Sequence, residues 1–213
     1  MITLDNYKIE DTLEALYNDA KNDQNRILRA LENRTSEHFE PIDFKDAYLA
    51  ISRQQGEHLK RLIKVNNVKN IVEFGTSFGI STLFLAQGVQ QTGGKIITTE
   101  LIESKAHKAI ENFKRAGVEK YIEVRIGNAM DTLKNYTDTI DLLLLDGWKD
   151  LYLPLFQLLE PNFTSNTIIY VDNAEMSDTQ VFLRAVSQNP NYIMHPTFGG
   201  KAVLIHFKKE NNE

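Results

Sequence analysis

Hydrophobic positions change their spacing near residue 66, and from there the chain alternates between two patterns. Short runs that are almost continuous in Val, Ile and Leu predict strands covered on both faces of a sheet. They span residues 70–74, 95–99, 121–126, 141–145 and 167–171. Amphipathic stretches with helical spacing lie between them, such as 81–91 and 104–116. This alternation predicts right-handed crossovers and a parallel sheet.

The end of the chain follows another pattern. Two β-rich runs, 192–196 and 202–208, are separated only by residues 197–201, which include two glycines. Such a short connection predicts an antiparallel hairpin. The expected fold is therefore α/β, with one doubly wound, mostly parallel, seven-stranded sheet that ends in the hairpin.

The first part of the chain is polar, with apolar residues three or four positions apart. This spacing predicts a helical N-terminal arm over about residues 5–37. Its apolar positions are Leu13, Leu16, Tyr17, Ala20, Ile27, Leu28 and Leu31. Residues 41–43 predict a break, and 54–65 a further helix. We expect residues 1–66 to form an arm or cap and residues 67–213 to form the ligand-binding domain, within one structural domain overall.

The composition narrows the class of protein. The chain has 213 residues, 42% of them hydrophobic, which suits one domain with a sizeable core. The net charge of −5 gives no broad attraction to phosphate backbones or anionic membranes. The absence of cysteine excludes thiol catalysis, disulfides and cysteine-ligated zinc. With no basic, apolar start and no long apolar run, we expect a cytoplasmic protein that does not enter the membrane.

A glycine-containing loop follows the first strand of the sheet. Gly75 and Gly79 let the backbone turn sharply and approach a ligand closely. Their G-x-x-x-G spacing is not the dinucleotide fingerprint, and the carboxylate of Glu73 would repel a pyrophosphate. The second strand then ends at Glu100, where folds of this class hold ribose hydroxyls. A cationic ligand without phosphate fits this pattern, although a simple strand-to-helix turn with a capping serine also would.

Oxygen-bearing side chains follow the fourth and fifth strands. Asp146 comes directly after the fourth strand, and Asp172 and Asn173 after the fifth. Because these strands are neighbours in such a fold, the three side chains should converge. They could supply half of an octahedral Mg²⁺ shell. The simpler interpretations are a turn at Asp146 and a helix cap at Asp172.

The pattern of these loops resembles the class I S-adenosylmethionine methyltransferases. The resemblance rests on residues 73–79, on Glu100 and on residues 127–131, and it covers the chain from about residue 45. It implies that Ser77 and Ser81 contact the methionine part of the cofactor and that Glu100 binds the ribose. It further implies a cofactor site that includes Glu73, Gly75, Gly79, Ala129, Met130, Asp146 and Trp148.

Residues 146–154 resemble catechol O-methyltransferase, and more loosely the caffeoyl-CoA O-methyltransferases. The resemblance implies that Asp146, Asp172 and Asn173 hold Mg²⁺. It also implies that Lys149 takes the proton from the attacking hydroxyl. Two departures argue against catechol itself: the family's histidine is replaced by Gly147, and the final turn, 197–201, carries no acid.

The leading hypothesis is a metal-dependent O-methyltransferase acting on a small molecule with adjacent hydroxyls. A second hypothesis is methylation of a hydroxylated base in tRNA, which the acidic net charge disfavours. A third is a methyltransferase that needs no metal. A module that binds the cofactor without turnover is disfavoured by Lys149 beside three oxygen donors. The apolar positions of the N-terminal arm offer a surface for a homodimer.

Overall fold

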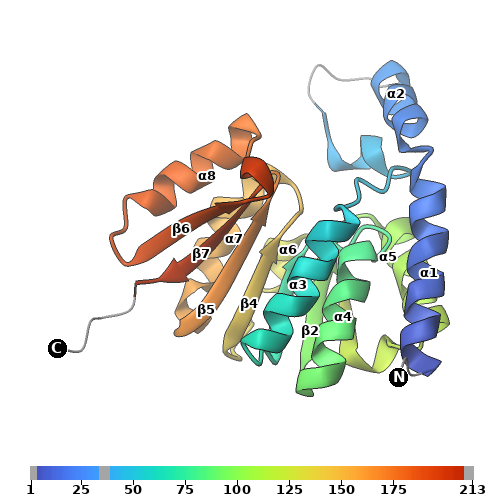
Figure 1. Cartoon of the computed structure of the whole chain (residues 1–213). Helices are drawn as coiled ribbons and strands as arrows, with labels where there is room; N and C mark the ends of the chain where they lie inside the picture. The colour runs from blue at the N-terminus through green and yellow to red at the C-terminus, as the bar shows by residue number, and fades with distance from the viewer. Residues whose placement is uncertain (1–3, 34–38, 209–213) are drawn as a thin grey trace.

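One sheet of seven strands runs through the protein. The computed structural model describes residues 4–33 and 39–208 of the chain. The strands follow the order β3-β2-β1-β4-β5-β7-β6 (Figure 1). Their bounds are β1 Asn70–Phe74, β2 Lys95–Glu100, β3 Ile122–Ile126, β4 Ile140–Leu145, β5 Phe163–Asp172, β6 Tyr192–Thr197 and β7 Ala202–Phe207.

The predicted architecture is confirmed. β1 to β5 pair in parallel, and β7 pairs antiparallel with both β5 and β6. The 3₁₀ turn η5 (Phe198–Gly200) connects the two strands of the final hairpin. Strand order reverses between β1 and β4, and in open α/β sheets this is where ligands bind.

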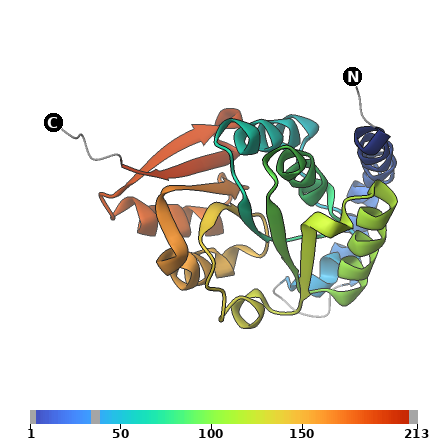
Figure 2. The ribbon, with the colours of Figure 1, turned by 90° about the horizontal axis from the view of Figure 1, so that it is seen from below.

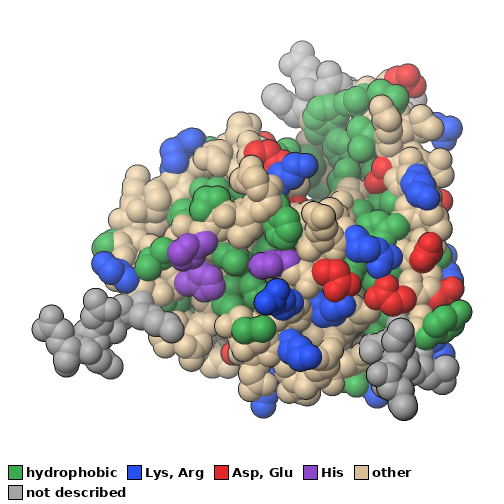
Figure 3. All heavy atoms as spheres, in the orientation of Figure 1, with side chains coloured by type: hydrophobic (Ala, Val, Ile, Leu, Met, Phe, Trp, Pro, Cys, Tyr) green, Lys and Arg blue, Asp and Glu red, His purple; other side chains and the backbone are tan. Residues whose placement is uncertain are grey.

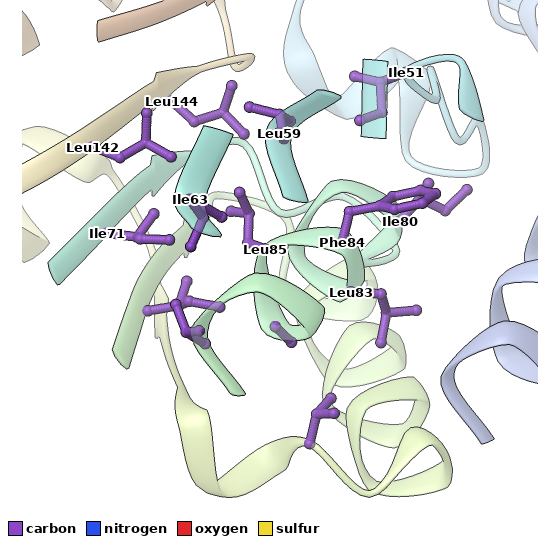
Figure 4. Packing of buried hydrophobic residues seen from close by; sticks show 14 of the residues in the cluster. Ile51, Leu59, Ile63, Ile71, Ile80, Leu83, Phe84, Leu85, Leu142 and Leu144 are labelled. Atoms are coloured by element: carbon purple, nitrogen blue, oxygen red, sulfur yellow. The ribbon is translucent and has the colours of Figure 1, made fainter. Parts of the chain in front are cut away.

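Helices from the first half of the chain cover one face of the sheet. α3 (Arg53–Val65), α4 (Ile80–Thr92) and α5 (Glu103–Ala116) pack there. Figure 2 shows α3 and α4 on the side of the sheet opposite α7 and α8. In Figure 4, Leu59 and Ile63 of α3 lie among Phe84 and Leu85 of α4 and Ile71, Leu142 and Leu144 of the sheet.

The other face is covered by α6 (Ala129–Thr132), α7 (Tyr152–Leu159) and α8 (Ser177–Ser187). Alternate strand residues supply the two cores, because successive side chains of a strand point to opposite faces. Ile71 belongs to the first core and Val72 to the second. This double covering explains why the strand sequences are nearly continuous in apolar residues.

The N-terminal arm contains α1 (Leu4–Ala20), α2 (Asp23–Asn33) and the 3₁₀ turn η1 (Pro41–Phe44). Leu13 and Leu16 of α1 are buried in the first core, as their spacing predicts. Leu28 and Leu31 of α2 instead remain 48% and 42% exposed. Residues 1–3, 34–38 and 209–213 lie outside the described residues, and the division into an arm and a domain at residue 66 stays a prediction.

Three further 3₁₀ turns complete the described chain: η2 (Glu119–Tyr121), η3 (Lys149–Leu151) and η4 (Glu160–Asn162). Within residues 4–33 and 39–208, no helix combines the length and apolar character needed to span a membrane.

Candidate active site at the carboxyl ends of the strands

The loops after β1 and β4 touch at the point where strand order reverses. Gly75 has a φ of +105°, and a Cβ atom there would lie 2.6 Å from the Asp146 carbonyl oxygen. The Asp146 N–H also donates to the Phe74 carbonyl, at 2.9 Å. Only glycine combines this backbone conformation with this close approach. The two loops that carry the predicted cofactor and metal residues are therefore packed against each other.

Glu100 ties the first loop to the end of β2. Its Oε2 accepts the Ser77 N–H at 2.8 Å, and its Oε1 accepts the Ile102 N–H at 2.9 Å. The Ser77 hydroxyl donates to the Tyr48 carbonyl, at 2.8 Å. The Glu100 carboxylate thus lies against the loop after β1, next to the predicted cofactor site. Each of its oxygens can accept a further hydrogen bond.

Glu73 is fully buried beneath this loop. Hydroxyls of Ser81 and Thr82 donate to its two carboxylate oxygens, each at 2.6 Å. Burial nevertheless raises the pKa of Glu73, because the hydroxyl contacts offset the loss of hydration only in part. A carboxylate kept at this electrostatic cost suits a site for a cationic ligand. The hydroxyl of Ser81, a predicted methionine contact, is turned toward Glu73.

The beginning of α4 is held close to α5. Gly79 has a φ of +90°, and a Cβ atom on it would lie 2.4 Å from the ring of Phe113. Its N–H donates to the Thr76 carbonyl, at 2.8 Å. The second glycine of the predicted loop is therefore needed for conformation and for packing.

The third loop, after β3, lies beside the second. The Gly127 N–H donates to the Glu100 carbonyl at 2.8 Å, and Asn128 caps the Met130 N–H at 2.9 Å. Ala129 is buried and Met130 half-buried. The Trp148 ring, from the loop after β4, lies 6.5 Å from that of Phe44 in η1. The predicted cofactor residues Ala129, Met130 and Trp148 thus stand on loops at the same edge of the sheet.

Asp146 and Asp172 come together at the ends of β4 and β5. The register that pairs Leu145 with Val171 brings the next residue of each strand to the same level. Burial raises the pKa of Asp146, and the adjacent negative charge of Asp172 raises it further. Burial also raises the pKa of Asp172, which is only 5% exposed. Two carboxyl groups in contact, one half-buried and one buried, create a strong local demand for positive charge.

A divalent cation fits this donor set. Asn173 follows directly with a φ of +52°, and its backbone partly offsets the rise in the pKa of Asp172. Carboxylate and amide oxygens are the hard ligands that Mg²⁺ prefers. In the described part of the chain, no three or more His, Cys, Asp or Glu side chains group into a metal site. Asp146 and Asp172 are only two such side chains, so the Asn173 amide would have to complete the predicted set of three ligands, which stays a prediction.

The Lys149 ammonium lies near both carboxyl groups. Its positive charge partly offsets the rise in the pKa of Asp146 and of Asp172. Its Nζ donates to the Gly147 carbonyl at 2.9 Å and lies 5.5 Å from the centre of the Tyr152 ring. At Gly147 itself, a Cβ atom would meet the Phe74 ring at 2.6 Å, which accounts for glycine in place of the family's histidine.

Two residues near the site were missed by the sequence analysis. Gln55 of α3 donates from Nε2 to Asp172 Oδ1, at 2.5 Å, across 117 positions of sequence. Lys105 of α5 is 5% exposed, with its Nζ 5.4 Å from the centre of the Phe78 ring. Burial lowers the pKa of Lys105, and the nearby charge of Glu100 opposes that shift. The S-x-x-Q pattern at 52–55 predicts the start of a helix, but it does not indicate that Gln55 contacts Asp172.

Arg53, at the start of α3, contacts the N-terminal arm. Its guanidinium pairs with Glu10 at 2.8 Å and lies 5.3 Å from the Tyr17 ring centre. Arg53 therefore fastens α1 to α3.

The surface beside the site is hollow. Figure 3 shows a hollow lined by hydrophobic side chains at the upper right, beside α2. A cavity of about 900 Å³ between α2, η1 and α5 includes Tyr48 and Phe78, next to the first loop. The histidines visible in Figure 3 gather over β6, β7 and α3, away from this hollow. The arm thus forms one wall beside the candidate site.

The comparisons with known proteins agree with the fold. The sequence model of a family described as O-methyltransferase matches residues 18–189. A catechol O-methyltransferase of Niastella koreensis is 31% identical over 59% of this chain and 58% of its own. The corresponding protein of Mycobacterium tuberculosis is 33% identical over 59% of this chain and 57% of its own. The chain thus spans less than two thirds of the length of these relatives.

The solved structures support the same fold. The O-methyltransferase of Bacillus cereus, solved in complex with SAH, has a TM-score of 0.67 to this chain. It is 23% identical, and the match covers 88% of this chain and 91% of that one. The predicted resemblance to catechol O-methyltransferases is confirmed by the relatives, and the class I fold by the structures.

Proposed function

This chain belongs to the O-methyltransferase family, and from that premise we propose that it methylates a hydroxyl of a small molecule with adjacent oxygens. The methyl donor is S-adenosylmethionine, and a divalent cation, Mg²⁺ or a similar ion, assists. The proposal rests mainly on the contact between the Asp146 and Asp172 carboxyl groups, with Lys149 beside both.

The residues of the first three loops would bind the donor. Glu100 offers acceptors for the ribose hydroxyls, while Ala129, Met130 and Trp148 would flank the adenine. Gly75, Ser77, Gly79 and Ser81 would surround the methionine part, above the buried charge of Glu73. Since the donor is a sulfonium with an ammonium group, a buried carboxylate nearby favours it over the neutral-sulfur product.

Asp146, Asp172 and Asn173 would hold the cation and, through it, the acceptor. When bound, a divalent cation supplies positive charge that acidifies the acceptor hydroxyl and orients its neighbouring oxygen. The close packing of Gly75 on Asp146 would keep the donor and acceptor sites at a fixed separation. Such positioning accounts for much of the rate of a group transfer.

Lys149 would act as the general base. It would take the hydroxyl proton as the acceptor oxygen attacks the methyl carbon. The carbon–sulfur bond breaks, its electron pair stays on sulfur, and the products are the methyl ether and S-adenosylhomocysteine.

The proposal is tested by turnover with isotopically labelled S-adenosylmethionine. The acceptors are a panel of vicinal diols and a hydroxylated tRNA, each with Mg²⁺ present or removed. Labelled O-methyl product from a small diol, only with the ion, supports the proposal. Turnover of tRNA alone would favour a nucleic-acid substrate. Full activity without the ion would favour a methyltransferase that needs no metal. No turnover of any acceptor would favour a module that only binds the cofactor.

A further inference from the structure

The Asp172 carboxylate contacts Gln55, a residue from a distant part of the sequence. Gln55 lies in the first turn of α3, and both it and Asp172 are more than nine-tenths buried. Gln55 Nε2 donates to Asp172 Oδ1. This contact engages one of the two oxygens of the carboxylate.

The direction of the Gln55 amide is fixed by its second partner. Its Oε1 accepts the Ser52 N–H at 3.0 Å and the Ser52 hydroxyl at 2.9 Å. A backbone N–H can only donate, so the oxygen of the amide must face Ser52. The NH₂ group therefore faces Asp172, and reversing the amide would break both sets of contacts.

The backbone that carries Gln55 cannot shift easily. The next residue, Gly56, is so close to α4 that a Cβ atom there would lie 2.3 Å from the Phe84 ring. Two turns further along α3, Ile63 packs against Gly88 of α4, where an added Cβ atom would lie 2.8 Å from the Ile63 side chain. Figure 4 shows this interface, with Leu59 and Ile63 of α3 facing Phe84 and Leu85 of α4. The Gln55 amide that contacts Asp172 is thus carried by a helix that packs tightly against α4.

We infer that Gln55 is a positioning residue for the divalent-cation site, holding the Asp172 carboxylate in the orientation that binds the ion. The inference rests on the proposed function. A neutral amide can fix a carboxylate without cancelling the charge that the ion requires, whereas a cationic partner would compete with the ion. Partners that orient a ligand in this way commonly affect metal affinity by about 10–100-fold.

The test is Mn²⁺ binding to the full-length protein, measured from the electron paramagnetic resonance signal of the free ion. Gln55→Met keeps the side-chain length and removes the amide, and we expect about 10–100-fold weaker Mn²⁺ binding. Gln54→Met makes the same change at an exposed neighbour on the same helix. Ser52→Ala removes the hydroxyl of the helix cap but leaves the Asp172 contact. We expect near-wild-type affinity from both.

Crystal structures without metal give a second readout. We expect one Asp172 rotamer in the wild type and Gln54→Met proteins, and a turned or divided carboxylate in Gln55→Met. Should that variant not fold, Gln55→Glu retains an acceptor for Ser52, lacks the donor, and should also turn Asp172 away. Wild-type Mn²⁺ affinity and an unmoved Asp172 in the Gln55 variant would overturn the inference alone. A wild-type protein that binds no Mn²⁺ would overturn the metal-dependent function and the inference with it.

Discussion

Gly75 and Asp146 are packed so closely that a Cβ atom at position 75 would lie 2.6 Å from the Asp146 carbonyl oxygen. The first residue belongs to the loop that would hold the methyl donor, and the second to the loop that would hold the acceptor through a cation. Neither loop can move toward or away from the other without breaking this contact. In the proposed reaction, this backbone packing would fix the distance between the methyl donor and the acceptor.

Gly75→Ala should damage stability and methyl transfer together. Alanine must adopt a φ of +105° and push the Asp146 backbone away, so we expect unfolding to be easier by about 2–4 kcal/mol. Gly93→Ala is the matched control, because Gly93 has a φ of +73° but nothing within 4 Å of its Cβ position. It should cost about 1 kcal/mol. Chemical denaturation and kcat would be measured for both; equal effects would mean that the loop contact is unimportant.

Glu100→Ala should weaken cofactor binding by about 1–3 kcal/mol, because a charged hydrogen-bond acceptor is lost. The variant also loses the carboxylate that accepts the Ser77 and Ile102 N–H groups. Glu100→Gln retains one carbonyl acceptor and should bind with intermediate affinity. Calorimetric titration with S-adenosylhomocysteine would measure all three proteins. Unchanged affinity in Glu100→Ala would rule out the ribose assignment.

Glu73→Gln should gain stability relative to the wild type as pH rises. It should also weaken binding of the cationic donor. Burial raises the pKa of Glu73 above its ordinary value of 4.5. Between 4.5 and that raised pKa, the unfolded chain ionises first, so the free energy of unfolding of the wild type falls as pH increases. Glutamine has no such dependence. The stability of the variant relative to the wild type should therefore be greater at pH 8 than at pH 5. A difference that does not change with pH would contradict the raised pKa.

Much of this arrangement could be predicted from the sequence, because it depends on local patterns. The strand predicted at 70–74 matches β1, and the alternation of strands and helices predicted the parallel pairing of β1 to β5. By contrast, β5 begins at Phe163, before the predicted 167, since residues 164–166 are polar and interrupt the apolar pattern. The apolar spacing predicted the helix α2, and within the described chain its Leu28 and Leu31 remain 48% and 42% exposed.

The candidate site shows the same division. Asp146 and Asp172 could be placed together because the ends of adjacent parallel strands must meet. The contact of Gln55 with Asp172 could not, because it depends on how α3 packs on α4 through Gly56, and no local pattern encodes that. Lys105 resembles a surface lysine in sequence, but the close packing of α5 and the loop at Phe78 buries it.

Asp146→Asn and Asp172→Asn should each weaken Mn²⁺ binding by more than about 100-fold, because each removes a charged oxygen ligand. Asp150→Asn is the control, since Asp150 lies in the same loop segment and is exposed. Its affinity should match the wild type. If all three variants bind Mn²⁺ equally, the ion is held elsewhere.

The central claim, that this site transfers a methyl group with Lys149 as its base, is tested most directly by the kcat of Lys149→Ala with the acceptor that the panel identifies. The account predicts a kcat lower by about 10²–10⁴-fold with cofactor and Mn²⁺ affinities nearly unchanged. It predicts no rescue in Lys149→Arg, because a guanidinium stays protonated. A Lys149→Ala protein with the wild-type kcat would contradict the account.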